Sequence, residues 1–518
     1  MRVVPVVVDN ALRLDGNVID HDLAEAIFDE LTIHNTAKDI ARKMERWGWQ
    51  EMPDEFQLGA LEGDIVVMPR GYAYQLKTLL REEGLKVQWI DRRKWHRHAP
   101  KLGNGAFPYR QHQREAVRQI IRNQQGMYEA PTGSGKTVTC IGFLTEKSPL
   151  KTLILVEKLD LLHQWRAELS RWLDIPEDEI GQIGDGKWFE GSRITVATVQ
   201  TLWKALKEDM FMRQYPYFFH QWDCVIIDEC HHVSAQTIRD LVSRFWAKYR
   251  FGVSATPDRK DDKFEFALNV LGEVFWEDDE NALRAGGVLV RPVVQVVRTN
   301  FDHVYWGDHH SDDDDECDVP GCRLSGKRPH FHQNNYGQVK KALVENQARN
   351  ILVIETLMRE VHKGKHHHLI VSDEVRHLEA LQETLDKQYG HISAKYKHSK
   401  GLPPVWVLTG RVRGEKRAQM KQEIIDAPAA IVFATVAKEG IDIPAIDRIY
   451  LPFPTRSAPK VQQWIGRGTR TLEGKSSTLI YDFFDVNCGV LKQQFRNRRF
   501  QCYDKLDIEV RLEQHYRN

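Results

Sequence analysis

Ala130-Pro-Thr-Gly-Ser-Gly-Lys-Thr137 is the stretch of this 518-residue chain that decides its fold. The residues before it, Gln124–Glu129, can end a short strand, and the apolar residues Val138–Leu144 can start a helix. A glycine-rich turn that leads into a helix N-terminus points several backbone N–H groups at one place and so forms an anion site. The pattern therefore predicts a phosphate-binding loop between a parallel strand and a helix.

Each residue type in this loop has a role that phosphate chemistry requires. Gly133 and Gly135 permit a tight backbone, and Lys136 would neutralise the β- and γ-phosphates. Thr137 would hold Mg²⁺ through its hydroxyl. Ala130 stands where the strict pattern has glycine, and an ordinary strand–helix turn could hold the same residues. The predicted nucleotide-binding residues of the loop are Pro131, Thr132, Gly133, Ser134, Gly135, Lys136 and Thr137.

A second segment, Cys224-Val-Ile-Ile-Asp-Glu-Cys-His-His232, is an apolar strand that ends in two carboxylates. Ligands of open α/β sheets bind at strand ends. Asp228 would bind Mg²⁺, directly or through water, and Glu229 would polarise the attacking water. Two acids can also merely solvate a strand end, but a phosphate loop upstream favours the catalytic interpretation.

Short apolar runs alternate with helical segments in two series, and continuous runs of this length are typical of parallel strands buried on both faces. The first series predicts strands at 152–156, 194–197, 224–227 and 250–254. The second predicts strands at 293–298, 368–371, 405–408, 430–434, 448–451 and 478–483, with a helix at 336–361. The chain is therefore expected to hold two α/β units in series.

The predicted domain boundaries follow from this alternation. Residues 1–105 form a small α+β N-terminal domain that could contact DNA, and residues 106–290 form the first lobe. Residues 291–500 form the second lobe, with a polar insert at about 303–335, and residues 501–518 form a C-terminal tail.

Composition limits the class of protein. The chain has 73 basic and 73 acidic residues, which argues against a histone-like positive coat but leaves room for a basic groove. Its seven cysteines are mostly scattered, so a disulfide framework is not expected. The sequence contains no run of about 18 apolar residues, and its apolar start predicts a strand rather than a secretion signal. We expect a cytoplasmic protein of a bacterial or phage-infected cell.

Several further motifs, in order, resemble those of superfamily 2 helicases of the DECH kind. The phosphate loop, the DECH segment and Ser254-Ala-Thr256 resemble motifs I, II and III, and Gln463-Trp-Ile-Gly-Arg-Gly-Thr-Arg470 is similar to motif VI. Segments 156–165, 197–201 and 434–444 resemble motifs Ia, Ib and V. Within the superfamily, Tyr109-Arg-Gln-His-Gln113 resembles the adenine motif of XPB-like, UvsW-like and type III restriction motor ATPases.

This resemblance implies two tandem RecA-like parallel-sheet domains with ATP between them. The second lobe would supply Gln463, Arg467 and Arg470, whose guanidinium groups stabilise charge on the transferring phosphoryl group. Gly440 and Asp442 would also lie at the nucleotide. On the first lobe, Gln113 would recognise adenine with Arg110 nearby.

Short polar side chains at predicted strand ends are candidates for binding nucleic acid. Hydroxyl groups and backbone amides there can bind successive phosphates without reading sequence. The predicted contacts are Lys158, Thr198 and Gln200 on the first lobe, and Ser372 and Thr435 on the second. Each could instead be an ordinary loop residue. The basic segments Arg92–Arg97 and Lys492–Arg499 are further candidates for DNA contact or for solvated linkers.

The insert holds four metal-ligand side chains, Cys317, Cys322, His330 and His332. Tetrahedral Zn²⁺ accepts a Cys₂His₂ set, and a small polar loop gains order from such a metal. The spacing is not that of a common zinc finger, so structural zinc and a solvated charged loop both stay open.

Taken together, the residues and the resemblance predict a nucleic-acid-stimulated ATPase that uses ATP and Mg²⁺ as a DNA helicase or branch-remodelling translocase. Its expected substrate is single-stranded, forked or branched DNA rather than RNA, in replication, recombination or repair. Two alternatives stay open: a motor subunit of a restriction or defence complex that moves on duplex DNA, and a nucleic-acid-sensing ATPase switch without strand separation.

Overall fold

The structure is a computed structural model, which describes residues 2–43, 47–93, 102, 107–208, 210–255, 263–302, 336–389, 402–412, 414–435, 443–455, 457–469, 472, 475 and 477–512. Contacts within the chain divide it into two compact units. The first holds Met1–Pro131 and Gly135–Asp279, and the second holds Glu280–Asn518 together with Thr132–Ser134.

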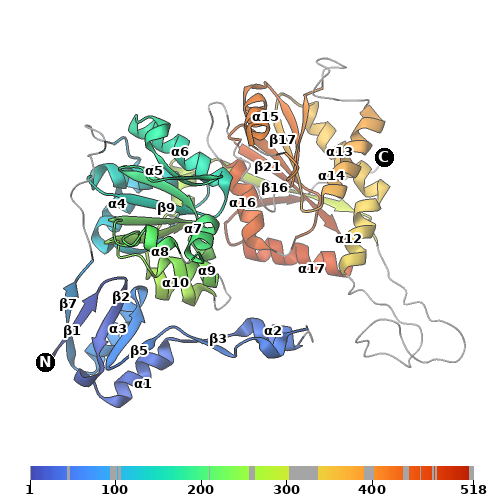
Figure 1. Cartoon of the computed structure of the whole chain (residues 1–518). Helices are drawn as coiled ribbons and strands as arrows, with labels where there is room; N and C mark the ends of the chain where they lie inside the picture. Colours follow the sequence, from blue (N-terminus) through green and yellow to red (C-terminus); the bar gives the residue numbers. More distant parts are fainter. Residues whose placement is uncertain are drawn as a thin grey trace, which may run out of the picture. The chain divides into compact units, whose positions relative to one another are not determined.

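The first unit begins with a small α+β domain built on a mixed sheet, whose strands run in the order β5-β6-β2-β1-β7 (Figure 1). In β1, Val4 and Val6 are buried while Val3 is exposed, because alternate side chains of a strand face opposite sides of its sheet. The buried side chains pack with those of two helices, α1 and α3. These elements are β1 (Arg2–Val8), β2 (Ala11–Asp15), α1 (His21–Glu30), β5 (Ala60–Glu62), β6 (Ile65–Pro69), α3 (Ala73–Glu82) and β7 (Leu85–Asp91).

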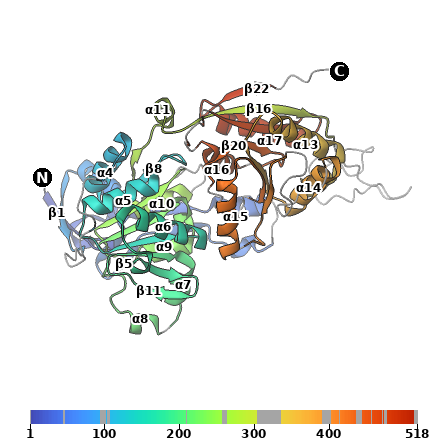
Figure 2. The same cartoon turned by 90° about the horizontal axis from the view of Figure 1, so that it is seen from above.

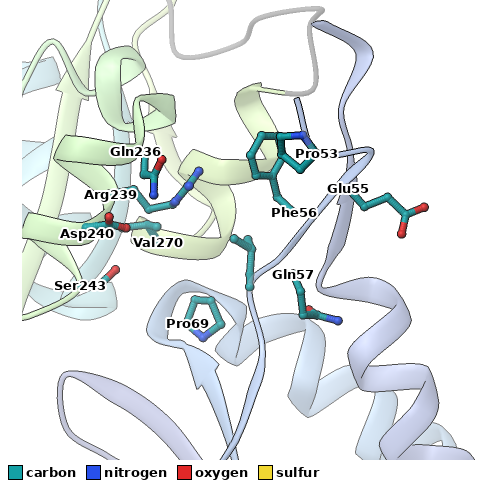
Figure 3. A pocket seen from close by; sticks show the side chains of 11 residues that line it. Pro53, Glu55, Phe56, Gln57, Pro69, Gln236, Arg239, Asp240, Ser243 and Val270 are labelled. Atoms are coloured by element: carbon teal, nitrogen blue, oxygen red, sulfur yellow. The ribbon is translucent and has the colours of Figure 1, made fainter. Parts of the chain in front are cut away.

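A narrow ribbon leaves this domain, formed by β3 (Thr32–His34) and β4 (Glu55–Gln57) with α2 (Thr36–Lys43) between them. The ring of Phe56 in β4 meets that of Phe266 edge-on, with 5.4 Å between ring centroids. A pocket lies beside this contact, between β4 and the first large α/β domain (Figure 3). None of the residues predicted to bind nucleotide or nucleic acid lines this pocket.

The rest of the first unit is an eight-stranded sheet in the order β11-β10-β12-β9-β13-β14-β8-β15. Only the β10–β11 pair is antiparallel. The strands are β8 (Gln125–Glu129), β9 (Thr152–Val156), β10 (Gly181–Gly184), β11 (Lys187–Phe189), β12 (Ile194–Thr198), β13 (Cys224–Asp228), β14 (Tyr249–Ser254) and β15 (Val274–Glu277). The four strands predicted for this lobe are confirmed.

Helices cover both faces of this sheet, as continuous apolar strands require (Figure 1). In β9, Ile154 and Val156 pack with one set of helices, whereas Leu153 and Leu155 pack with the other. The first set is α4 (Gln111–Asn123), α5 (Lys136–Glu146) and α6 (Leu159–Leu173). The second set is α7 (Val199–Leu206), α8 (Phe211–Gln214), α9 (Gln236–Val242) and α10 (Lys263–Leu271).

Two buried arginines join the N-terminal domain to this sheet. Arg70, 1% exposed, donates to Gln125 and to the carbonyl oxygens of Ala247 and Lys248. Arg250 donates to the carbonyl oxygen of Asn10, and burial lowers the pKa of Arg250 to about 9. A buried guanidinium without these acceptors would be costly, so the hydrogen bonds specify how the domain docks.

The second unit is built on a seven-stranded sheet with the order β18-β19-β17-β20-β21-β16-β22, in which every paired strand is parallel. The strands are β16 (Arg291–Thr299), β17 (His367–Ser372), β18 (Val405–Leu408), β19 (Ala430–Thr435), β20 (Ile446–Leu451), β21 (Ser477–Asp485) and β22 (Glu509–Leu512). The six strands predicted here are confirmed. Strand β22, with buried Tyr503 and Ile508 before it, lies in the segment 501–518 that the sequence suggested as a tail.

Helices again cover both faces of the sheet (Figure 2). One face packs against α15 (Gly414–Asp426), α16 (Ala458–Gly468) and α17 (Gly489–Arg498), and the other against α13 (Gln347–Val361) and α14 (Val375–Tyr389). The predicted single helix at 336–361 is wrong: α12 (Tyr336–Glu345) and α13 are separate helices. They break at Asn346, whose side chain caps α13 by accepting from the Arg349 backbone N–H. A short helix, α11 (Glu280–Ala285), begins the unit.

None of the helices within the described ranges combines the length and the apolar character that crossing a membrane would require. The two large sheets, one almost wholly parallel and one parallel, with helices on both faces, confirm the predicted α/β fold class.

Candidate functional site

The glycine-rich segment forms the turn that its sequence predicts. It follows β8, and the Ala130 backbone N–H donates to the carbonyl oxygen of Ser254 at the end of neighbouring β14. Gly133 and Gly135 have φ angles of +91° and +94°, which side chains of L-residues rarely adopt. Gly135 is the N-cap of α5, so the turn leads directly into a helix N-terminus. This arrangement fits an anion such as a nucleotide phosphate.

Lys136 is the first residue of α5, and its ammonium lies over the loop. Its Nζ donates to the carbonyl oxygen of Ala130 at 2.9 Å and to that of Pro131 at 3.5 Å. Thr137 follows in the first helical turn and is half-buried. The structure therefore brings a cation and a hydroxyl to the phosphate loop, as a phosphate and Mg²⁺ site requires.

Gln113 on α4 packs directly against the phosphate loop and is 3% exposed. Its Oε1 accepts from the Arg110 backbone N–H at 2.9 Å, and its Nε2 donates to the Gly135 carbonyl oxygen at 3.5 Å. A Cβ on Gly135 would lie only 2.5 Å from that Nε2. Gln113 thus connects the start of α4 to the phosphate loop, while Arg110 is exposed at the N-cap of α4.

Asp228 and Glu229 lie at the carboxyl end of β13, with Asp228 held through both of its oxygens. The Trp165 indole N–H donates to Oδ2 at 2.8 Å, and the Glu229 backbone N–H donates to Oδ1 at 3.0 Å. Burial raises the pKa of Asp228, and the Glu229 charge adds to the rise, whereas Trp165 and Lys136 oppose it. The charge of Lys136 thus acts on the strand-end carboxylate, which links the loop to the DECH segment.

Glu229 has a φ of +49° and lies beside Ser254 of the third motif and His231, to which the sequence gave no role in the site. The Nδ1 of His231 lies 3.2 Å from Glu229 Oε2 and 3.0 Å from Ser254 Oγ. Burial opposes ionisation of Glu229, but the hydrogen bond from His231 and the charge of Lys136 lower its pKa. Glu229 is therefore held as a carboxylate, able to accept a proton or to orient water.

Two partners of the carboxylates were missed from the sequence, Trp165 and His231. Trp165 was read only as the end of motif Ia and His231 only as the last letter of DECH. A histidine two residues after Glu229 was a usable sign, because its ring can reach that carboxylate. Trp165 gave no such sign, since it lies 63 residues from Asp228 along the chain.

In the second unit, Gln463 and Arg467 lie one helical turn apart on α16, and both are half-buried. Thr469 follows the last residue of α16, and its carbonyl oxygen accepts a hydrogen bond from the Val290 backbone N–H. Three other predicted residues, Arg470, Gly440 and Asp442, lie outside the described residues, as does Thr256 of the third motif.

The predicted nucleic-acid contacts on the first lobe follow the ends of β9 and β12. Lys158 is the N-cap of α6 and is half-buried, and Gln200 is exposed in the first turn of α7. Thr198, at the end of β12, is 4% exposed, and its hydroxyl donates to that of Thr201 at 2.7 Å. Only Lys158 and Gln200 therefore present side chains to the surface.

On the second lobe, Thr435 is half-buried at the end of β19, whereas Ser372 is fully buried at the end of β17. The Ser372 hydroxyl accepts from the Glu374 backbone N–H and lies 3.3 Å from His377 Nδ1. It stabilises its own turn, so the expectation that this hydroxyl binds phosphate is not met by the geometry.

The two basic segments also contain side chains that are bonded within the protein and side chains that are exposed. Arg93 pairs with Asp91 and donates to Gln124, so it belongs to the junction between domains, while Arg92 is exposed. Lys94, Trp95 and Arg97 lie outside the described residues. Near the C-terminus, Arg498 is 3% exposed and donates to both Asp482 oxygens. The prediction that Arg498 touches DNA is therefore wrong, because the side chain closes a buried ion pair.

The insert with Cys317, Cys322, His330 and His332 lies outside the described residues. Within the ranges that the structure does describe, no group of three or more histidine, cysteine or acidic side chains is arranged to hold a metal ion.

Known proteins with similar sequence and fold bear on the same region. Residues 106–259 match the family model described as "Type III restriction enzyme, res subunit". The chain is 26% identical over 406 residues to the Halobacterium salinarum protein named "Putative DNA 3'-5' helicase Rad25", a match that covers 78% of this chain and 58% of that protein. It is 25% identical over 343 residues to the Sulfurisphaera tokodaii protein named "DNA 3'-5' translocase XPB2", covering 65% and 72% of the two chains.

The structure of S. cerevisiae Dbp5 bound to RNA and ADP BeF3 has the same fold, with a TM-score of 0.50 and 14% identity over 78% of this chain and 89% of that one. The chain spans less than two thirds of the length of the Halobacterium salinarum relative. The predicted resemblance is confirmed: residues 106–259 match the restriction-enzyme family model, and the two relatives carry the names Rad25 helicase and XPB2 translocase.

Proposed function

We propose that this chain, whose first lobe carries the superfamily 2 restriction-motor domain, is an ATP-driven motor that moves along or remodels DNA. One observation carries the proposal. The Ala130 N–H of the phosphate loop donates to the Ser254 carbonyl oxygen, and the Ser254 hydroxyl donates to Glu229, so the loop and the carboxylates lie together as one set at the carboxyl ends of parallel strands. A nucleoside triphosphate with Mg²⁺ is the ligand whose chemistry matches this set.

The residues would divide the work of hydrolysis among them. Backbone N–H groups of the loop and Lys136 would bind the phosphates, and Thr137 with Asp228 would hold Mg²⁺, which offsets developing negative charge. Glu229, kept ionised by His231, would orient the attacking water and accept its proton. Gln113 would recognise the adenine base, since it already contacts the phosphate loop at Gly135.

The second lobe would complete the reaction with Arg467 and Arg470. Gln463 and Arg467 occupy one face of α16, and a guanidinium is suited to a transferring phosphoryl group. Because these guanidinium groups would come from the second lobe, hydrolysis would depend on closure of the two lobes on the nucleotide. Closure and release would then be the mechanical step.

DNA is the proposed track, supported by the names of the relatives and by the groups at the strand ends. Lys158 and Gln200 place a charge and an amide at the surface. Binding through such groups reads the phosphate backbone, so it should be independent of sequence and weakened by salt.

Strand separation and duplex translocation are two different modes of action, and the match to the restriction-enzyme family supports translocation. A helicase would separate a labelled fork when given ATP, whereas a duplex translocase would displace a third strand from triplex DNA without opening the fork. An ATPase that fails both assays while still responding to DNA would act as a switch.

The proposal is tested first with Lys136→Ala. DNA-stimulated ATP hydrolysis should fall by a factor on the order of 10²–10³, because the charge that binds the phosphates is gone, while DNA binding survives in part. Lys147→Ala, just after the other end of the same helix, is the matched control and should keep normal turnover. Retention of DNA-stimulated turnover by Lys136→Ala would refute the phosphate-site assignment.

A further inference from the structure

A single hydrogen bond joins α6 to the carboxylate at the end of β13. Trp165 lies in the second turn of α6, is 2% exposed, and donates its indole N–H to Asp228 Oδ2 at 2.8 Å. Its ring packs in the core on the α4–α6 side of the sheet. The donor is therefore held by its surroundings, and the acceptor is the aspartate that ends β13.

The other oxygen of Asp228 is held from a different direction, by the backbone N–H of Glu229 at 3.0 Å. Two donors on two oxygens fix both the position and the rotation of a carboxylate plane. Each oxygen accepts one of these bonds and keeps further acceptor capacity, since an ionised carboxylate has about four lone-pair sites. The arrangement orients Asp228 without using up the lone pairs that a metal or its bound water would need.

A buried tryptophan in this lobe does not need such a partner. Trp222 is fully buried in the core on the opposite face of the same sheet. Its indole N–H has no hydrogen-bond acceptor among the described residues. The core therefore tolerates an indole without an acceptor, and the bond from Trp165 is not a general consequence of burying the side chain.

We propose that Trp165 is a positioning residue for magnesium: its indole N–H sets the orientation in which Asp228 meets the metal. The inference rests on the proposed function, and it assigns to α6 a part in the active centre. Groups that hold a metal ligand in place commonly contribute a factor of about 10–100 in metal affinity or activity. The same range is expected here.

The test compares Trp165→Phe with Trp222→Phe. Both changes replace a buried indole by a smaller ring and should lower the melting temperature similarly, but only the first removes a hydrogen bond to Asp228. The Mg²⁺ concentration that half-saturates DNA-stimulated ATP hydrolysis should rise about 10–100-fold for Trp165→Phe and stay at the wild-type value for Trp222→Phe.

A second readout does not depend on turnover. Binding of Mn²⁺ in the presence of ADP, measured by electron paramagnetic resonance, should weaken by a similar factor for Trp165→Phe alone. A wild-type metal dependence and Mn²⁺ affinity in Trp165→Phe, or an equal loss in Trp222→Phe, would overturn the inference. If Trp165→Phe does not fold, benzothienylalanine at position 165 replaces the N–H by sulfur at nearly constant volume and decides the same question.

The two failures are distinguishable. Absence of DNA-stimulated hydrolysis in the wild-type protein would defeat the proposed function. Normal wild-type hydrolysis, with no change in metal dependence in the position-165 variant, would defeat only the role of Trp165.

Discussion

Two strands of this molecule, one in each large sheet, end in an aspartate, and the two aspartates have different hydrogen-bond partners. Asp228 ends β13 in the first lobe and accepts hydrogen bonds from an indole and a backbone amide. Asp485 ends β21 in the second lobe and is 2% exposed. The Arg349 guanidinium donates to both its oxygens, at 2.7 and 3.1 Å, and the Thr299 hydroxyl donates at 2.5 Å.

The difference lies in the donors. Neutral donors orient Asp228 and leave lone pairs on both of its oxygens, so a cation can still bind there. The bidentate Arg349 guanidinium neutralises Asp485 and, together with the Thr299 hydroxyl, donates three hydrogen bonds to its two oxygens. An apolar strand that ends in aspartate therefore predicts a ligand site only when no arginine from elsewhere in the fold closes it. By this criterion we expect the second lobe to contribute cations, rather than the Asp485 carboxylate, to the proposed ATP hydrolysis.

The largest expected effect tests that statement with Arg467→Ala. If the second lobe supplies a guanidinium to the phosphoryl group, ATP binding should persist while hydrolysis falls on the order of 10³-fold. Nucleotide binding by a fluorescent ATP analogue and steady-state hydrolysis with DNA separate the two steps. Hydrolysis near the wild-type rate would show that Arg467, like Arg349, only supports the fold.

Arg349→Met addresses the other arginine. Removing the guanidinium leaves the Asp485 carboxylate buried without its ion partner, which should cost about 3–5 kcal/mol of unfolding free energy. Arg359→Met is the control on the same helix, since Arg359 is exposed there, and it should cost less than about 1 kcal/mol. Denaturant unfolding monitored by circular dichroism compares them. Equal unfolding free energies of the two variants would mean that the ion pair at Asp485 does not stabilise the fold. The contrast drawn with Asp228 would then fail.

Local patterns in the sequence were sufficient for the sheets and for the phosphate loop. Runs such as residues 153–156 are apolar throughout, and only a strand covered on both faces by helices uses every residue of such a run. The loop at Gly133 and Gly135 was equally predictable from the sequence, because its φ angles require glycine. Features written within about ten consecutive residues were therefore predictable.

The partners of charged side chains were not predictable, because they come from distant segments. Trp165 reaches Asp228 across 63 residues and Arg349 reaches Asp485 across 136. In the same way, Arg498 looked like part of a basic surface until Asp482 closed on it, and Ser372 looked like a phosphate ligand until its own turn enclosed it. Composition and spacing do not say which polar group tertiary packing will bury.

The smallest expected effect concerns Lys158, which follows the end of β9 at the carboxyl edge of the first sheet. If its ammonium contacts one DNA phosphate, Lys158→Ala should lower the slope of log K against log salt by about 0.7–0.9, because one fewer counterion is released. Lys147→Ala removes the same charge before the start of β9, at the opposite edge, and should leave the slope unchanged. Fluorescence anisotropy with labelled single-stranded and duplex DNA over a series of salt concentrations measures both slopes. Equal slopes for the two variants would show that Lys158 does not contact a DNA phosphate. The carboxyl edge of the first sheet would then keep only its proposed role in ATP hydrolysis.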